Sequence, residues 1–100
     1  LLDESDCIHP RTLEALRAAA AQGVHVMVAT GRSELATLPV LEQLNIPHPA
    51  VVFNGAGVWC PKAGRLIEER VLSERTLARA VRFGSEGGYM TVAMCAGVKY

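Results

Sequence analysis

The sequence lacks a net charge, a cysteine pair and a long apolar run. Its ten Lys and Arg residues balance ten Asp and Glu residues, so its charge indicates neither a nucleic-acid partner nor a membrane-surface partner. No apolar run reaches the roughly 18 residues that a membrane-spanning helix needs. The first six residues are acidic rather than basic, unlike a signal peptide. We therefore expect a protein with no membrane partner.

Cysteine is scarce and dispersed. Cys7, Cys60 and Cys95 are odd in number, and none of them forms a C-x-x-C motif or a zinc-binding pattern with a histidine. We expect free thiols rather than disulfides, as is typical of a cytoplasmic protein. The motifs G-x-G-x-x-G and G-K-[ST] are also absent, which excludes the common nucleotide-binding loops.

What the sequence does contain is an alternation of helix and strand patterns. Half of its residues are hydrophobic, which is enough for the core of one domain. Pro10 suits the first position of a helix, and Gly23 suits its end. Residues 24–29 are short, β-branched and almost wholly apolar, which predicts a strand buried on both faces. The apolar face of the first helix consists of Leu13, Leu16 and Ala20.

The same order of elements then repeats. After a polar turn at 30–33, a second helix is predicted up to Leu44. Because a proline breaks the interior of a helix, we expect its regular part to start at Pro39. Residues 50–53 form a second buried strand. Helix, strand, helix and strand in this order predict an α/β fold with a parallel sheet and right-handed crossovers.

The pattern changes after Asn54. Residues 58–71 are typical of a β-hairpin, and Ser73 is placed to cap a third helix. Residues 89–95 alternate as a half-buried strand, and a further strand is expected after Gly97. We therefore divide the chain into an α/β layer over 1–72 and the opening of an α+β layer over 73–100.

Small polar residues follow both predicted buried strands. Thr30, Gly31 and Arg32 follow the first, and Asn54 and Gly55 follow the second. In an open α/β sheet, ligands bind beyond the carboxyl ends of the strands, so both groups would face one crevice. A hydroxyl, close backbone N–H groups, a guanidinium and the start of a helix together favour an anion. Phosphate is the ligand that these groups suggest.

Simpler interpretations remain open for each feature. Thr-Gly after a strand is also a common turn with a helix cap, and Asn-Gly is a common hairpin turn. The acidic residues near the start of the chain are typical of a solvated loop rather than of a carboxylate pair or a Mg²⁺ site. His25 is expected to be a packed or edge residue, and His48 lies in a proline-containing loop. The residues of the acidic loop are Asp3, Glu4 and Asp6.

The order of the motifs resembles that of a known family. Residues 1–3, 8–16, 28–32 and 52–56 are similar to the N-terminal part of Cof-type phosphatases, which belong to the haloacid dehalogenase superfamily. Residues 65–100 resemble that family's hairpin and the opening of its cap domain. The resemblance implies a partial Rossmannoid core over 1–72 with a parallel sheet, and the beginning of a cap domain over 73–100.

The resemblance also implies a mechanism. In this family an Asp of a D-x-D-G-T-L-L motif attacks a phosphate monoester, a second Asp acts as acid and base, and Mg²⁺ neutralises the charge. The implied partner is a small phosphorylated metabolite such as a sugar phosphate. Thr30 would bind the transferring phosphoryl group, with Gly31 donating a backbone N–H. Arg32, Asn54 and Gly55 would line the same pocket.

The sequence departs from the family at its start. Leu1 and Leu2 match the last two letters of the motif, so both catalytic Asp residues would lie before residue 1, and Asp3 is not the nucleophile. The family's first strand, its Lys and its acidic metal-binding motif would also lie outside the chain. We expect a truncated, inactive and aggregation-prone piece. The alternatives are a phosphomutase or sugar-phosphate phosphatase relative with the same core, or a non-catalytic module that binds a phosphorylated ligand.

Overall fold

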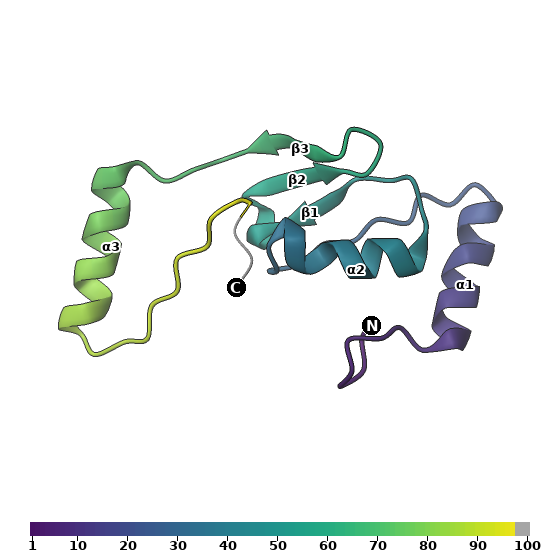
Figure 1. Ribbon diagram of the computed structural model, residues 1–100, viewed down its shortest axis with the longest axis horizontal. Coiled ribbons are helices and arrows are strands. Elements are labelled where there is room, and N and C mark those ends of the chain that lie inside the picture. Colours follow the sequence, from purple (N-terminus) through teal and green to yellow (C-terminus); the bar gives the residue numbers. More distant parts are fainter. Residues whose placement is uncertain (98–100) are drawn as a thin grey trace.

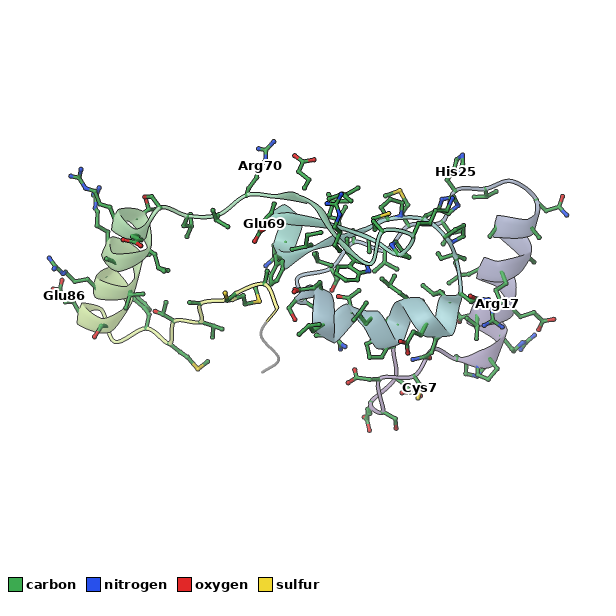
Figure 2. The ribbon with its side chains drawn as sticks, turned by 45° about the horizontal axis from the view of Figure 1, so that its top comes forward. Cys7, Arg17, His25, Glu69, Arg70 and Glu86 are labelled. Atoms are coloured by element: carbon green, nitrogen blue, oxygen red, sulfur yellow. The ribbon has the colours of Figure 1, made fainter. Side chains whose placement is uncertain are left out.

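The computed structural model describes residues 1–97 (Figure 1). We call residues 1–70 the body, in which α2 (Glu34–Leu44) packs beside a small sheet and α1 (Pro10–Ala21) packs at one end of α2, while a third helix lies apart at the opposite end (Figure 1). Side chains of the body helices and of the sheet fill the space between these elements (Figure 2). In chain order the elements are α1 (Pro10–Ala21), α2 (Glu34–Leu44), β1 (Ala50–Val52), the 3-10 turn η1 (Phe53–Gly55), β2 (Gly57–Cys60), β3 (Arg65–Glu69) and α3 (Glu74–Glu86).

Helix α1 forms as the sequence predicts. Pro10 occupies the first turn, where its missing N–H costs nothing, and the His9 ring accepts a hydrogen bond from the Arg11 N–H at 3.2 Å. Gly23, with φ of +86°, follows the last turn in the left-handed conformation that favours glycine. The predicted apolar face packs against a buried cluster of Ile8, Val40, Leu44 and Ile46.

Helix α2 follows the polar turn at 30–33 and ends at Leu44 as predicted, but its regular part begins at Glu34 rather than at Pro39. The Ser33 hydroxyl accepts from the Ala36 N–H at 3.3 Å, and the Thr37 hydroxyl donates to the Ser33 carbonyl at 2.7 Å. Pro39 therefore lies inside the helix, and the prediction that the regular part starts there is wrong. The reason is that the capped first turn does not use the N–H that Pro39 lacks, so the helix loses only one later bond.

The sheet of the described residues is antiparallel, in the order β1-β2-β3. Ala50 pairs with Trp59 and Val52 pairs with Gly57, and a register shift between Val58 and Trp59 bends β2 against β3. The predicted hairpin is therefore confirmed as β2 and β3. Ala50 and Val52 are fully buried in the second core cluster, which also contains Leu41.

The predicted parallel sheet is reduced to a single bridge. Residues 24–29 form no regular strand, and their one ladder contact is the parallel bridge between Ala29 and Val51. Val24 and Met27 are 53% and 52% exposed, so the prediction of burial on both faces is wrong. The physical reason is that Val51 pairs with one edge of this segment, while no strand among residues 1–97 pairs with its other edge.

Helix α3 begins after Ser73, whose hydroxyl accepts from the Thr76 N–H at 3.2 Å, as predicted. Residues 89–95 form no strand, so that prediction is wrong: the segment returns from the end of α3 toward the body (Figure 1) without joining a ladder of paired strands. Met90 is 95% exposed. The strand expected after Gly97 lies outside the described residues. No helix of the described part is long and apolar enough to cross a membrane.

Candidate functional site

The two polar segments predicted to share a crevice are joined through their main chains. The Thr30 N–H donates to the Val51 carbonyl at 2.9 Å, and the Asn54 N–H donates to the Thr30 carbonyl at 3.1 Å. The Phe53 N–H donates to the Arg32 carbonyl at 2.8 Å. The ends of segment 24–29 and of β1 therefore meet, as expected for neighbouring parallel segments even though they share only one bridge.

Gly31 lies against the end of the Asn54 side chain at this junction. A Cβ built on Gly31 would lie 2.6 Å from the Asn54 side-chain oxygen, closer than ordinary contact. Phe53, Asn54 and Gly55 all have positive φ, of 52°, 54° and 97°. Asn and Gly tolerate this region, whereas Phe does so at a cost. The sequence reasoning did not single out Phe53.

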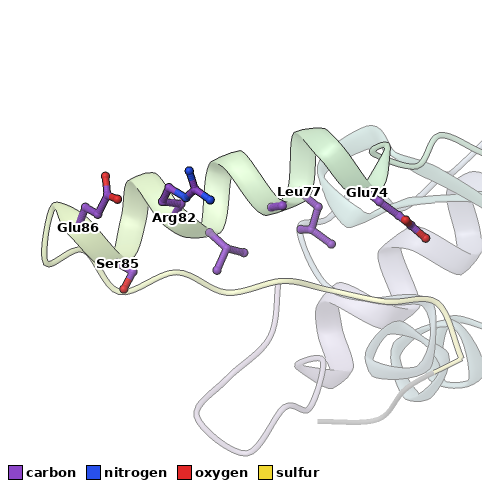
Figure 3. A pocket seen from close by; sticks show the side chains of 7 residues that line it. Glu74, Leu77, Arg82, Ser85 and Glu86 are labelled. Carbon is purple, nitrogen blue, oxygen red and sulfur yellow. The ribbon is translucent and has the colours of Figure 1, made fainter.

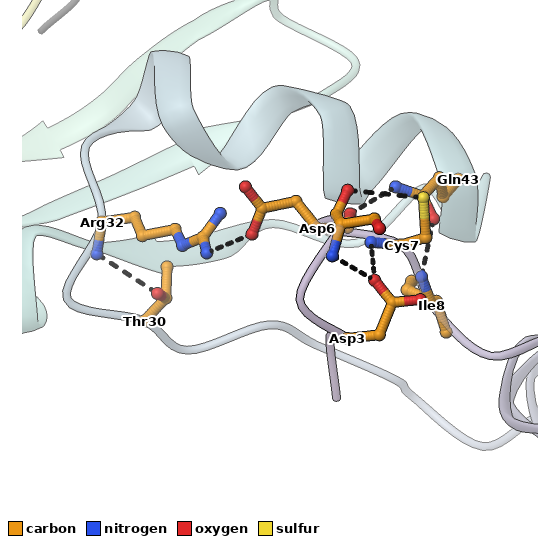
Figure 4. Close-up of polar contacts among 8 residues, drawn as sticks. Asp3, Asp6, Cys7, Ile8, Thr30, Arg32 and Gln43 are labelled. Atoms are coloured by element: carbon orange, nitrogen blue, oxygen red, sulfur yellow. Dashed lines mark hydrogen bonds and ion pairs between the residues drawn. The ribbon is translucent and has the colours of Figure 1, made fainter.

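The Thr30 hydroxyl faces its own turn. Its oxygen accepts a hydrogen bond from the Arg32 N–H at 3.2 Å (Figure 4), the geometry of a turn that a hydroxyl stabilises. This hydrogen bond matches the turn of the simpler interpretation, whereas the helix cap is provided by Ser33. A hydroxyl has one donor and two acceptor positions, so the Thr30 O–H group can still donate to a ligand.

Arg32 has a partner that the sequence did not reveal. Its guanidinium forms an ion pair with Asp6 at 2.8 Å (Figure 4), and the two side chains are 41% and 69% exposed. Asp6 is therefore an ion-pair partner of Arg32 and not only a solvated residue of the acidic loop. An anion at Arg32 would share the guanidinium with this carboxylate.

Gln43 fixes the acidic loop onto α2. Its side-chain oxygen accepts from the Ile8 N–H at 2.9 Å, and its amide donates to the Asp6 carbonyl at 3.2 Å (Figure 4). Within the loop, the Asp3 carboxylate accepts from the N–H groups of Ser5 and Cys7. These contacts place Asp6 in front of Arg32, and no local sequence signal marks Gln43 as their source.

A cavity of about 280 Å³ opens beside Thr30 and Arg32. Gly31, Asn54 and Gly55 are not among the described residues that line it. The structure thus brings two of the five predicted residues to the cavity wall. Asn54 is joined to Thr30 by a main-chain hydrogen bond, and Gly31 and Gly55 are the neighbours of these residues along the chain. The remaining wall is mostly apolar and consists of Leu1, Leu2, Val28, Ala29, Thr37 and Val40.

A buried acid lies in the first turn of α2. Glu34 is only 4% exposed, and one carboxylate oxygen accepts from the Gly97 N–H. The second oxygen is buried without a hydrogen-bond partner among the described residues. The sequence analysis did not identify Glu34, because acidic residues are common in the first turn of any helix.

The residues around this cavity do not fit a Mg²⁺ site. Mg²⁺ needs several oxygen ligands, commonly carboxylates, in near-octahedral geometry. Across residues 1–97, no group of three or more His, Cys, Asp or Glu gathers where it could hold a metal ion. Asp6 is already paired with Arg32. No metal-dependent step is therefore assigned to these residues.

A larger hollow of about 630 Å³ lies along α3 (Figure 3). Its apolar wall includes Leu77 and Val81, with Arg82, Ser85 and Glu86 toward the C-terminal end of the helix (Figure 3). None of the predicted phosphate-binding residues lines it.

A family model described as haloacid dehalogenase-like hydrolase matches residues 1–98. The chain belongs to this hydrolase family. A solved haloacid dehalogenase-like hydrolase from Bacillus subtilis superposes with a TM-score of 0.74 at 25% identity, covering 88% of this chain and 30% of that one. A solved protein of Geobacillus kaustophilus gives a TM-score of 0.67 at 31% identity, covering 88% and 33% of the two chains.

Curated relatives of this haloacid dehalogenase-like chain are named as candidate phosphatases. One from Streptococcus pyogenes is 34% identical over 76 residues, which is 73% of this chain and 28% of the relative. Another, YkrA of Bacillus subtilis, is 34% identical over 73 residues, which is 73% and 27% of the two. The chain thus spans less than a third of the length of these relatives.

The family resemblance and the α/β fold class predicted from the sequence are confirmed. Membership of a hydrolase family is confirmed as well. The boundary between 1–72 and 73–100 stays a prediction, and so do the phosphate-binding roles of the five site residues.

Proposed function

We propose that this haloacid dehalogenase-like protein is a phosphatase that hydrolyses small phosphate monoesters, such as sugar phosphates, in the cytoplasm. Residues 30–32 and 54–55 form one side of its phosphate pocket. The observation that carries this proposal is the main-chain junction of these two segments beside a cavity lined by Thr30 and Arg32. The names of the curated relatives support the same reaction class.

Each residue has a distinct task in the proposed pocket. Thr30 donates its O–H to a phosphoryl oxygen while its oxygen keeps the hydrogen bond from Arg32. Gly31 allows the main chain to approach the anion, since a side chain there would strike Asn54. Arg32 supplies positive charge that Asp6 partly balances, and the start of α2 adds its dipole.

The covalent chemistry is proposed to come from residues other than 1–100. An Asp nucleophile would form an aspartyl-phosphate intermediate, and Mg²⁺ held by other carboxylates would supply charge neutralisation. Residues 1–97 provide no fitting ligand set for that ion. The proposed role of this chain is to bind and orient the phosphoryl group.

The test titrates inorganic phosphate into the 100-residue chain and follows its backbone amides by NMR. We expect shifts at Gly31, Arg32 and Asn54, several-fold weaker binding in Thr30→Ala, and unchanged binding in the control Thr12→Ala, which alters an exposed residue of α1. Equal affinity in Thr30→Ala, or shifts confined to the Arg side chains of α3, would contradict the proposed pocket. Mg²⁺-dependent turnover of p-nitrophenyl phosphate by this chain would contradict the external nucleophile.

A second candidate function is a non-catalytic module that binds a phosphorylated ligand. It is favoured by a cavity that contains Thr30 and Arg32 but lacks carboxylates suited to Mg²⁺. The coding sequence upstream of Leu1 separates the two candidates. An in-frame Asp-x-Asp-Gly-Thr supports the phosphatase, and a start or stop codon directly before Leu1 supports the module.

A further inference from the structure

A pair of histidines lies at the amino ends of segment 24–29 and of β1, the two segments whose carboxyl ends form the crevice. Segment 24–29 begins near His25, and the loop before β1 contains His48. The two imidazole rings lie 4.9 Å apart between centroids, with an interplanar angle of 82°. His25 lies at the end of the sheet nearest α1 (Figure 2). The amino ends of the two segments thus hold a histidine pair, while their carboxyl ends hold the phosphate pocket.

The structure fixes the position of His48 in particular. Pro47 and Pro49 flank it and restrict the backbone of the loop. Ile46 and Ala50, on either side of these prolines, are buried in the two core clusters. The loop is therefore anchored at both ends, and the half-buried His48 ring is presented from a rigid support.

The ring nitrogens of this histidine pair have no hydrogen-bond or ion-pair partner among the described residues. The third histidine, His9, uses its Nδ1 to accept from Arg11 at the start of α1. Neither His25 nor His48 makes a hydrogen bond or an ion pair with any of residues 1–97, and their contact with each other is edge-to-face. His25 is exposed and His48 is half-buried, so solutes can reach both rings.

We propose that His25 and His48 form a two-histidine binding site for one late transition-metal ion of the Zn²⁺, Ni²⁺ or Cu²⁺ class. Imidazole is a preferred ligand of these ions and a poor one for Mg²⁺. The χ2 torsion of histidine is broad. Each ring can therefore turn one nitrogen toward a shared ion at about 2 Å, and water completes the coordination. The site is independent of the proposed phosphatase function.

An ion at this site would reinforce a weak part of the fold. Segment 24–29 is joined to β1 by a single bridge, at Ala29 and Val51. A metal held by His25 and His48 cross-links the same two segments at their opposite ends. Binding to the folded state alone raises stability in proportion to the logarithm of ion concentration over Kd.

The experiment titrates NiCl₂ into the whole chain by calorimetry, with MgCl₂ as the comparison ion. We expect one Ni²⁺ per chain and no Mg²⁺ binding at this site. Loss of even a supporting partner of a metal ligand costs about tenfold or more in affinity. His25→Gln and His48→Gln should therefore weaken Ni²⁺ binding at least that much, whereas the matched control His9→Gln should leave it unchanged.

A second measurement keeps the proposal falsifiable if a variant does not fold. Paramagnetic Ni²⁺ added to the unaltered chain should broaden the ring signals of His25 and His48 at concentrations that leave His9 sharp. Equal broadening of all three histidines, no binding by the unaltered chain, or undiminished binding in both single variants would overturn the two-histidine site.

Discussion

The burial of the Glu34 carboxylate predicts that removing its charge will stabilise the protein. One of its oxygens accepts from Gly97, and the other is buried without a hydrogen-bond partner among the described residues. A buried polar group without a partner costs about 1–3 kcal/mol, and more if it is charged. Against this, an acid in the first turn of a helix gains about 0.3–1 kcal/mol from the helix dipole. The cost exceeds the gain.

Glu34→Gln separates these two effects. The amide oxygen can still accept from the Gly97 N–H, the side chain keeps its shape, and the buried charge is removed. We expect the free energy of unfolding to rise by about 1 kcal/mol, because the amide nitrogen that replaces the second oxygen still lacks a partner but carries no charge, and burying the charge costs more than the dipole interaction gains. The measurement is urea-induced unfolding of the whole chain, followed by the circular dichroism of its helices.

The matched control is Glu42→Gln, which removes an exposed acid from the same helix. Such surface substitutions change stability by about 0.5 kcal/mol or less. If Glu34→Gln lowers stability while Glu42→Gln does not, the carboxylate is satisfied in solution and the reasoning is refuted.

Three further predictions concern the crevice and the core. Asp6→Asn frees the Arg32 guanidinium, so calorimetry should show several-fold tighter binding of inorganic phosphate, and unchanged affinity would mean that Arg32 does not contact the anion. The free energy of unfolding should change by at most about 1 kcal/mol because the ion pair is exposed. Gly31→Ala should displace the mobile end of the Asn54 side chain, seen as a shift of its amide NMR signals with little loss of stability; an unmoved Asn54 contradicts the packing. Leu44→Ala removes a side chain that is 1% exposed and should lower the unfolding free energy by about 2–5 kcal/mol; a loss below 1 kcal/mol would show that this cluster is not the core.

The starts of α1 and α3 were predictable because their signals are local. Pro10 lacks an N–H that the first turn of a helix does not use, and the Ser73 hydroxyl accepts from an N–H three residues along the chain. A hydroxyl therefore marks the helix start whatever the rest of the fold does. The hairpin of β2 and β3 was predictable for the same reason, since one short turn joins its strands.

The segment at 24–29 was not predictable in this way. Its apolar run indicates a buried strand, but a regular strand also needs neighbours that supply a ladder, and among the described residues only β1 does so. Alternation at 89–95 was misleading for the same reason. Both errors arise because strand pairing depends on residues distant in the sequence, which local composition does not encode.

The candidate site shows the same division. The sequence identified the Thr30 and Asn54 segments because each follows an apolar run, and the structure joins their main chains. The sequence analysis placed Asp6 in a solvated loop, although Asp6 forms an ion pair with Arg32, 26 positions further along the chain. Gln43, which holds that loop, and the meeting of His25 with His48 also depend on tertiary packing alone.

The two connections of α3 have a mechanical consequence. One leaves the body at Arg70, whose N–H donates to the Ala56 carbonyl at 2.8 Å, and the other returns at Gly97, whose N–H donates to Glu34. Figure 1 shows α3 suspended between these two strands of chain. A part attached at two fixed points rotates about the line that joins them and resists displacement along it. We therefore expect α3 to move mainly by rotation about the line that joins Arg70 and Gly97, and the hydrogen bond to Glu34 fixes one end of that line.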